Sequence, residues 1–337
     1  MSYGPPAFPP PPSEPAPQLT GRSLHPLSLT RIVELSIRLL RFQWRPIYGV
    51  AAVILVPLYV ISGALQSIIA EPFYAWLADV QRMLEQLTPG AVPPDLPPLP
   101  AGFYEAIVAS IVLGIAAGAV VYVANAAIVH AIGEAYEGRN PSIRGSLGAV
   151  ARRLLTLLAV MIITGLVIAG LMVLGFSAGV LAIALGDGGG LGAFAGLLVI
   201  VATVFAAVFI GIRWSLVPQT VMLEDNGPLA SLGRSWSVVG GSTLRVLGYL
   251  IVIGLVIGLI VSSLTTVANQ LLTAGRLAFD PAMIAAQSVV GGLIGLIFVP
   301  FTNAVFSLLY YDLRWRRGEL TPPVEQPAHE PPLPYGG

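Results

Sequence analysis

Long apolar runs, separated by short polar stretches, dominate the chain. Six of these runs extend over residues 47–70, 103–132, 154–185, 191–216, 244–272 and 285–311. Each run exceeds the ~20 residues with which an α-helix crosses a hydrocarbon core of ~30 Å. The pattern predicts an all-α integral membrane protein whose six transmembrane helices form three consecutive pairs.

A second pattern, with the period of an α-helix, precedes each predicted pair. Before the third pair, apolar side chains recur every three or four positions, at Leu229, Leu232, Trp236 and Val239. Pro228 is typical of the first turn of a helix. The same spacing joins Ile32, Leu35, Leu39 and Phe42 before the first pair, and Ile143, Leu147, Val150 and Leu154 before the second. We interpret the three segments as amphipathic helices at the cytoplasmic membrane surface.

Other segments predict a further surface helix and two tails. Residues 71–87 are amphipathic and follow the first span, so we expect a separate surface helix there. The proline-rich ends, residues 1–26 and 318–337, predict disordered cytoplasmic tails around a membrane domain at 27–317. An alternative role for the N-terminal tail is to dock a protein partner that recognises proline.

Charged residues are scarce and lie outside the centres of the apolar runs. They make up 10% of the chain against 55% hydrophobic residues, which excludes an ordinary soluble surface. All basic residues are arginines, and all except Arg82 and Arg276 precede, separate or follow the three predicted pairs. The positive-inside rule then predicts a multi-pass protein of the cell membrane with both termini in the cytoplasm. With zero net charge, we expect membrane lipids and no nucleic acid as partners.

Two stretches resemble a known family. Residues 213–250 read RWSLVPQTVMLEDNGPLASLGRSWSVVGGSTLRVLGYL, and the last apolar run ends in LLYYDLRWRRGEL. Both are similar to motifs of the glycerophosphoryl diester phosphodiesterase membrane-domain family. The residues that carry the resemblance are Glu224, Gly227, Pro228, Arg234, Ser235, Trp236, Gly240 and Arg245, then Tyr310, Tyr311, Asp312, Arg314 and Arg316. The first half of the chain fits by architecture alone. The resemblance implies a stand-alone membrane module without the catalytic barrel of some members, and so does not imply hydrolysis of glycerophosphodiesters.

The candidate functional residues are polar groups at the ends of the spans and within them. At the membrane boundary they are Glu224, Pro228, Arg234, Trp236, Arg245, Asp312 and Arg314. We expect a cytoplasmic network that fixes the amphipathic helices, formed by Glu224, Asp225 and Asp312 with Arg213, Arg234 and Arg314. The alternative is that the arginines bind lipid headgroups. Within the spans the polar candidates are Asn125, His130, Asn269 and Asn303.

The intramembrane candidates also allow two interpretations. Buried amides such as Asn269 and Asn303 often form hydrogen bonds across helices. His130 and Glu134 are spaced i and i+4, which favours an interfacial hydrogen bond or ion pair. A proton or substrate relay is the alternative.

One stretch of the sequence matches a catalytic motif without the context that the motif needs. Residues 175–179 match GxSxG, but a serine nucleophile needs a strand-to-helix elbow and a nearby histidine, whereas Ser177 lies inside an apolar run. We expect Gly175 and Gly179 to permit close helix packing instead. The same expectation applies to the pairs Gly114/Gly118, Gly254/Gly258 and Gly291/Gly295. The glycine-rich residues 186–192 join two spans, which favours a turn over a phosphate loop.

These observations predict no catalytic site, cofactor or metal. The chain has no cysteine, which excludes thiolate chemistry, and its other histidines, His25 and His329, lie in the tails. We expect a non-catalytic polytopic membrane module that organises lipids or a partner protein. The alternative is a transporter or lipid-translocating protein, because Pro57, Pro300 and the asparagines lie within spans.

Overall fold

The described residues of the computed structural model, 27–86, 97–186, 190–274 and 281–320, form nine α-helices and no strand. The helices are α1 (Leu29–Phe42), α2 (Trp44–Glu85), α3 (Phe103–Tyr136), α4 (Ile143–Leu185), α5 (Gly190–Arg213), α6 (Val217–Glu224), α7 (Pro228–Gly240), α8 (Thr243–Thr273) and α9 (Pro281–Arg316). Six are long and apolar enough to cross a membrane: α2, α3, α4, α5 continued by α6, α8 and α9. The predicted all-α fold is confirmed. The two proline-rich tails lie outside the described residues, except for residues 318–320.

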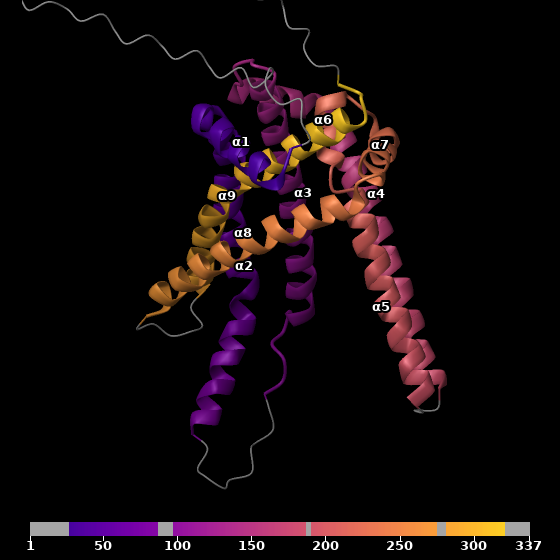
Figure 1. Ribbon diagram of the computed structural model, residues 1–337. Coiled ribbons are helices and arrows are strands. Elements are labelled where there is room, and N and C mark those ends of the chain that lie inside the picture. The colour runs from indigo at the N-terminus through magenta and orange to yellow at the C-terminus, as the bar shows by residue number, and fades with distance from the viewer. Residues whose placement is uncertain (1–26, 87–96, 187–189, 275–280, 321–337) are drawn as a thin grey trace, which may run out of the picture.

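Consecutive long helices pack as three pairs. α2 contacts α3, α4 contacts α5, and α8 contacts α9, while α9 also packs along α2 and reaches α1 and α3. In Figure 1, α1, α6 and α7 gather at one end of the molecule, and the α4–α5 hairpin diverges from α2 and α3 at the other. We call the end with the short helices the interfacial end. The first and last described segments meet there, because Leu27 N–H donates to Asp312 at 2.9 Å.

The protein core is concentrated near the interfacial end. The fully buried side chains there include Ile32, Ile47, Ile128 and Leu309. Farther along the long helices, large apolar side chains point outward, as at Leu174 (73% exposed) and Leu191 (86%). Such surface suits hydrocarbon chains and would be unfavourable in water.

Glycines set the closest contact between α4 and α5. A Cβ added at Gly175 would lie 2.0 Å from Thr203 Oγ1, and one at Gly179 would lie 3.0 Å from the Gly196 carbonyl oxygen. The predicted close packing at Gly175 and Gly179 is therefore confirmed. It is wrong for Gly114, Gly118, Gly254, Gly258 and Gly295, which have no heavy atom of the described chain within 4 Å of an added Cβ.

The amphipathic helix α7 buries part of the predicted apolar face, Leu232 and Val239, which are 6% and 0% exposed. Its interior face is centred on Ser231, Ser235 and Val238, whose side chains are 0–1% exposed. Leu229 and Trp236, which belong to the predicted apolar face, are 73% and 39% exposed. Small residues let α7 approach its neighbours closely. The bulky apolar side chains are then left on the side available to lipid.

The same shift occurs before the other two pairs. Ser36 in α1 and Ser146 in α4 are buried, whereas Phe42 and Leu154 are 51% and 38% exposed. The buried Ser36 hydroxyl donates a hydrogen bond to the Ile32 carbonyl oxygen of the same helix at 2.8 Å. The three amphipathic segments therefore share a serine-bearing inner face, which the hydrophobic pattern alone does not reveal.

Two predicted boundaries between helices are absent. The amphipathic segment before the second pair continues into its span as the single 43-residue helix α4, because the stretch around Arg152 and Arg153 contains no helix-breaking residue. The surface helix expected at 71–87 is likewise the last part of the 42-residue α2, which continues through Pro57 and Pro72. By contrast, α7 ends before α8 at Gly241.

Candidate functional site

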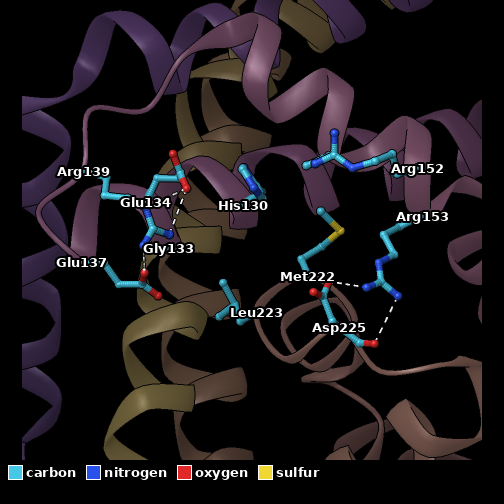
Figure 2. Close-up of a pocket in the computed structure, with 11 residues that line it drawn as sticks. His130, Gly133, Glu134, Glu137, Arg139, Arg152, Arg153, Met222, Leu223 and Asp225 are labelled. Carbon is cyan, nitrogen blue, oxygen red and sulfur yellow. Dashed lines mark hydrogen bonds and ion pairs between the residues drawn. The ribbon is translucent and has the colours of Figure 1, made fainter.

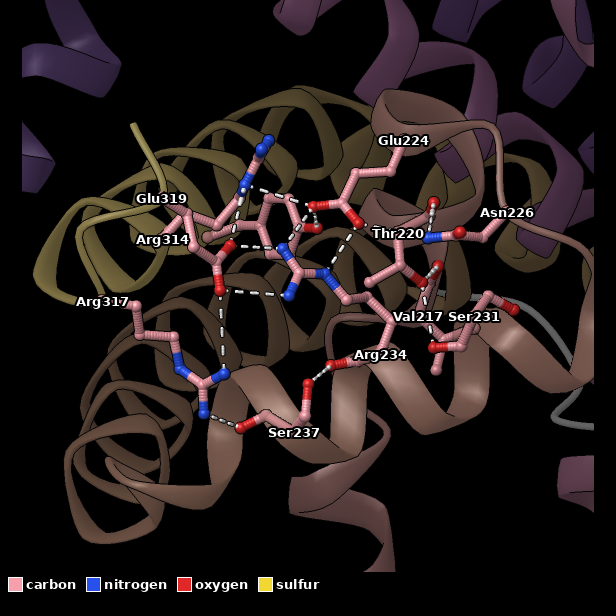
Figure 3. A network of polar contacts seen from close by, with 11 residues as sticks. Val217, Thr220, Glu224, Asn226, Ser231, Arg234, Ser237, Arg314, Arg317 and Glu319 are labelled. Carbon is pink, nitrogen blue, oxygen red and sulfur yellow. Dashed lines mark hydrogen bonds and ion pairs between the residues drawn. The ribbon is translucent and has the colours of Figure 1, made fainter. Parts of the chain in front are cut away.

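Polar residues at the interfacial end form two separate groups. We call the first the Glu224 cluster; it consists of Glu224, Arg234, Tyr310, Arg314 and Glu319 and is drawn in Figure 3. We call the second the His130 cavity, drawn in Figure 2. Its lining residues are His130, Gly133, Glu134, Glu137, Arg139, Ala149, Arg152, Arg153, Met222, Leu223 and Asp225.

A tight turn between α6 and α7 positions the centre of the Glu224 cluster. α6 ends at Glu224 because Asp225 adopts the left-handed conformation, with φ of 56°. Pro228 then occupies the first turn of α7, where its missing N–H leaves no helical hydrogen bond unmade. The two helices lie against each other, and Arg234 of α7 faces the Glu224 carboxylate.

Three helices meet at the Glu224 carboxylate. Arg234 donates from Nε and Nη2 to its two oxygens at 2.7 and 2.9 Å, a bidentate pair. The Tyr310 hydroxyl also donates to it, and Arg314 Nε lies 3.1 Å from Oε1. Figure 3 shows Glu224, Arg234 and Arg314 converging from α6, α7 and α9. The Glu224 side chain is only 15% exposed, so this one acidic group joins three elements away from most of the solvent.

Glu319 adds a second carboxylate to the cluster. It accepts a hydrogen bond from Arg234 Nη1 at 3.1 Å, and its Oε2 lies 3.5 Å from Arg314 Nε. Nearby, Arg317 donates to the Ser237 carbonyl. Glu319 lies in the segment predicted as a tail, so its role was missed. The available signal was an acidic residue directly after the arginine-rich end of α9.

The pairing keeps the carboxylates of the cluster charged. Glu224 lies beyond Arg213, where the apolar run of α5 ends. Burial raises the pKa of the Glu224 carboxyl, but the hydrogen bonds from Arg234 and Tyr310 outweigh it and bring that pKa below its ordinary value. The hydrogen bond from Arg234 lowers the pKa of Glu319 in the same way. Both groups are therefore ionised at neutral pH.

Asp312 belongs to a different contact, so the single predicted network is in fact divided. The Asp312 side chain is 1% exposed and accepts from Leu27 N–H at 2.9 Å and from Arg316 Nε at 2.8 Å. Arg245 Nη1 lies 3.9 Å away, and its Nη2 donates to the Leu27 carbonyl at 2.8 Å. These contacts tie the start of α1 to α8 and α9.

Arg213 makes cation–π contacts with Phe209 and Trp236 at the outer surface of α7. The Arg213 guanidinium lies 5.0 Å from the centre of the Phe209 ring and 5.1 Å from that of Trp236. The carbonyl of Arg213 accepts from the Ser235 hydroxyl at 2.8 Å, which fixes α7 against the end of α5. Trp236 therefore combines protein contacts with a partly exposed ring, as is typical of membrane-boundary residues.

The intramembrane asparagines behave differently from one another. Asn303 of α9 donates to the Asn125 side-chain oxygen of α3 at 2.9 Å, and to the Val299 carbonyl at 2.9 Å. This is a hydrogen bond across two helices. Asn269 forms no such bond, because its buried side-chain oxygen has no hydrogen-bond partner among the described residues.

The His130 cavity lies between α3, the first part of α4 and α6, and has a volume of about 480 Å³. His130 Nδ1 lies 3.4 Å from Ser146 Oγ, and Glu134 pairs with Arg139 at 2.9 Å, so each of the two residues has a polar partner near the membrane boundary, on another side chain and not on each other. The other contacts that cross the cavity margin are between Arg153 and Asp225, including a hydrogen bond to the Asp225 carbonyl at 3.1 Å.

Arg152 stands apart from the other charges of the cavity. Within the part of the chain that the structure describes, it makes no hydrogen bond and no ion pair. Figure 2 shows it beside the cavity, on the same side as Arg153 and opposite the side chains of Glu134 and Glu137.

The GxSxG stretch has the geometry of a packed helix. Ser177 lies within the continuous α4 and is exposed on its surface, with no strand or sharp turn before it. The glycines on either side of it contact α5, as described above. In the glycine-rich stretch 186–192, Gly186 follows the end of α4 and residues 190–192 begin α5, while residues 187–189 lie outside the described residues.

Comparison with known proteins identifies a family. A family described as a domain of unknown function, DUF7847, matches residues 58–313, which is most of the chain. The chain belongs to this family. The match includes all six spans except the beginning of the first, and ends within the cluster of charged residues at the end of α9. No curated protein and no solved structure matches the chain. This DUF7847 protein is thus a polytopic helical membrane protein of a family without an assigned function.

Proposed function

We propose that the protein is a non-catalytic membrane module that organises lipids or a partner protein, similar to the glycerophosphoryl diester phosphodiesterase membrane domain. One observation carries this proposal. The residues of the two resembling motifs, Glu224 and Arg234 in one and Tyr310 and Arg314 in the other, meet in a single cluster. Their polar atoms are directed at one another, which is the arrangement of a structural brace.

The bracing holds the short interfacial helices in place while bulky apolar side chains remain on the outside. Leu229 and Trp236 on α7, and Phe42 on α1, have the exposure expected of groups that insert among lipids at the interfacial depth. A rigid set of such helices would order the surrounding headgroups. This supports a role in which the exposed apolar side chains organise lipid by contact, without cleaving any bond.

The test is to purify the full chain in mild detergent, reconstitute it in nanodiscs and measure two quantities. Native mass spectrometry should detect lipids retained by the protein, and phosphodiesterase and lipase assays should give no turnover above empty nanodiscs. Hydrolysis that is abolished by Ser177→Ala or His130→Ala would overturn the proposal.

A transporter or lipid-translocating protein is the second candidate, and the hydrogen bond between Asn125 and Asn303 favours it. The bond lies next to Pro300 in α9, where the proline removes one backbone hydrogen bond and permits bending. Flux of fluorescent lipids and of polar metabolites in proteoliposomes tests this candidate. Absence of any protein-dependent flux would count against it.

We also propose that both termini and the interfacial end face the cytoplasm. The distribution of arginines supports this orientation. A reporter fused after Gly188 should then be read outside the cell and one after Asp225 inside, and the reverse result would overturn the assignment. A pull-down that compares the full chain with one lacking residues 1–25 tests the separate proposal of a protein partner for the proline-rich tail.

A further inference from the structure

The His130 cavity is the group of polar residues that the bracing role leaves unexplained. Its volume of about 480 Å³ is in the range of small-molecule sites, which is about 300–1,000 Å³. Its lining includes Arg152, which has no counter-ion among the described residues, and His130, whose Nδ1 faces Ser146 at 3.4 Å. The arginines of the Glu224 cluster, in contrast, are already occupied by carboxylates.

The charges around the cavity balance overall but are divided between its two sides. On the α3 side, Arg139 is set against two carboxylates, Glu134 and Glu137. On the α4 side, Asp225 is set against two arginines, Arg152 and Arg153. One net negative charge therefore remains on the first side and one net positive charge on the second. Figure 2 shows this separation, with His130 between the two sides.

Such a divided cavity discriminates among ligands by their charge. A simple anion would be attracted by one wall and repelled by the other, and so would a simple cation. A ligand with both charges, separated by a short chain, satisfies both walls. The floor between them is formed by Met222 and Leu223 of α6, apolar side chains that suit a short hydrocarbon linker.

The floor is fixed by a close contact between helices. A Cβ added at Gly133 would lie 2.5 Å from Leu223 Cδ2, so α3 and α6 approach at the base of the cavity.

We propose that the His130 cavity binds a zwitterionic phosphate–amine group. The phosphate lies against Arg152, with His130 and Arg153 beside it, and the ammonium group lies against Glu134 and Glu137. Phosphate and guanidinium groups pair strongly, and a carboxylate is the natural partner of an ammonium group. The ligand is either the headgroup of a phosphatidylethanolamine lipid or free phosphoethanolamine. The inference rests on the proposed function, because it names the lipid class that the module would recognise.

The experiment uses the full chain in nanodiscs made only of phosphatidylglycerol. Free phosphoethanolamine and inorganic phosphate are titrated separately by calorimetry. In a second arm, the nanodiscs contain equal parts of phosphatidylglycerol and phosphatidylethanolamine, and native mass spectrometry reports the lipid retained. Binding of free phosphoethanolamine points to the soluble source, and retention of phosphatidylethanolamine that phosphoethanolamine does not displace points to the lipid.

Arg152→Ala should weaken the binding about tenfold or more, which corresponds to at least about 1.4 kcal/mol. The matched control is Arg144→Ala, on an exposed arginine of the same helix that does not line the cavity and should bind normally. Glu134→Gln should weaken phosphoethanolamine binding without weakening the binding of inorganic phosphate, because it removes a negative charge that attracts the ammonium group and repels a simple anion.

Three results would overturn the inference: no binding in either arm, equal affinity of the wild type for inorganic phosphate and phosphoethanolamine, or unchanged binding by Arg152→Ala. Retention of other lipids in those cases would leave the proposed module intact. Hydrolysis of a lipid would overturn the module while leaving the binding result readable.

Discussion

The Glu224 cluster and the His130 cavity are built from the same residue types at the same end of the molecule, yet they are opposites. In the cluster, one carboxylate receives Arg234, Arg314 and Tyr310, and the groups fill the space between three helices. In the cavity, ion pairs lie at the margins and a volume of about 480 Å³ remains between them. Residue types alone therefore do not reveal whether polar side chains brace a fold or line a binding site. What distinguishes the two regions is whether the polar groups are fully paired with one another.

The largest expected effect is on the cluster. Glu224→Ala removes the more buried of the two carboxylates that pair with Arg234 and Arg314, and leaves two partly buried guanidinium groups to share Glu319. We expect a loss of about 3 kcal/mol in the free energy of unfolding, the low end for a broken buried pair. Unfolding in mild detergent, followed by tryptophan fluorescence, measures it.

The control for that experiment is Glu34→Ala. Glu34 also pairs with two arginines, Arg31 and Arg38, but on the exposed face of α1, where its side chain is 47% exposed. Water screens such a surface carboxylate, so we expect a much smaller loss than for Glu224→Ala. Equal losses in the two variants would refute the distinction between a brace and a solvated pair.

Acid should weaken the Glu224 cluster. The folded-state pKa values of Glu224 and Glu319 are lowered, so their stabilising effect is complete above the ordinary carboxyl pKa of 4.5 and is lost as pH falls through the lowered values. The melting temperature should therefore decline below about pH 4.5. Glu319→Gln should make that decline shallower. An acid profile that Glu319→Gln leaves unchanged would exclude Glu319 from the titration.

At the cavity margin the effect should be smaller. Arg153→Ala removes the pair with Asp225, whose side chain is 76% exposed. We expect a loss of about 0.2–1 kcal/mol, because water screens the pair and replaces it. The same fluorescence-detected unfolding gives the value. A loss as large as that of Glu224→Ala would mean that the cavity margin also braces the fold.

The smallest effect is expected at Arg152. Because Arg152 has no partner among the described residues, Arg152→Ala should change the free energy of unfolding by no more than about 0.5 kcal/mol. Its melting temperature in lipid-free detergent tests this expectation. A stabilisation that appears only with added phosphoethanolamine, and only while Arg152 is present, would sharpen the contrast further.

The hydrophobic pattern predicted the membrane helices well because their signal is long and simple. The pattern failed to predict that an amphipathic segment and the span after it form one continuous helix. The Arg152–Arg153 stretch looks like the polar end of a surface helix, yet nothing in it interrupts α4. Similarly, the pattern placed Leu229 inside and Ser231 outside, whereas Leu229 is exposed and Ser231 is buried. A hydrophobic pattern does not distinguish an apolar face that contacts lipid from one that contacts protein.

The candidate residues were predictable individually but not in their pairings. The resemblance pointed to Glu224, Arg234 and Arg314, which do meet, and separately to Asp312, which contacts Leu27 N–H instead. For Glu319 the sequence offered a weak signal, its position directly after the arginine-rich end of α9. For the isolation of Arg152 it offered none, because that depends on how helices distant in sequence approach one another. Spacing along the chain carries no such information.

The continuity of α4 has a mechanical consequence. This one helix carries Arg152 at the wall of the cavity and, farther along, Gly175 at the contact with α5. Because α4 has no break, we expect displacement of the hairpin within the bilayer to shift the cavity wall as well, and occupancy of the cavity to resist that displacement. The coupling is reciprocal by thermodynamic necessity. Lateral tension in the membrane and occupancy of the cavity would then be two inputs to a single movement, which spin labels on α5 and α2 would report as a change in their separation.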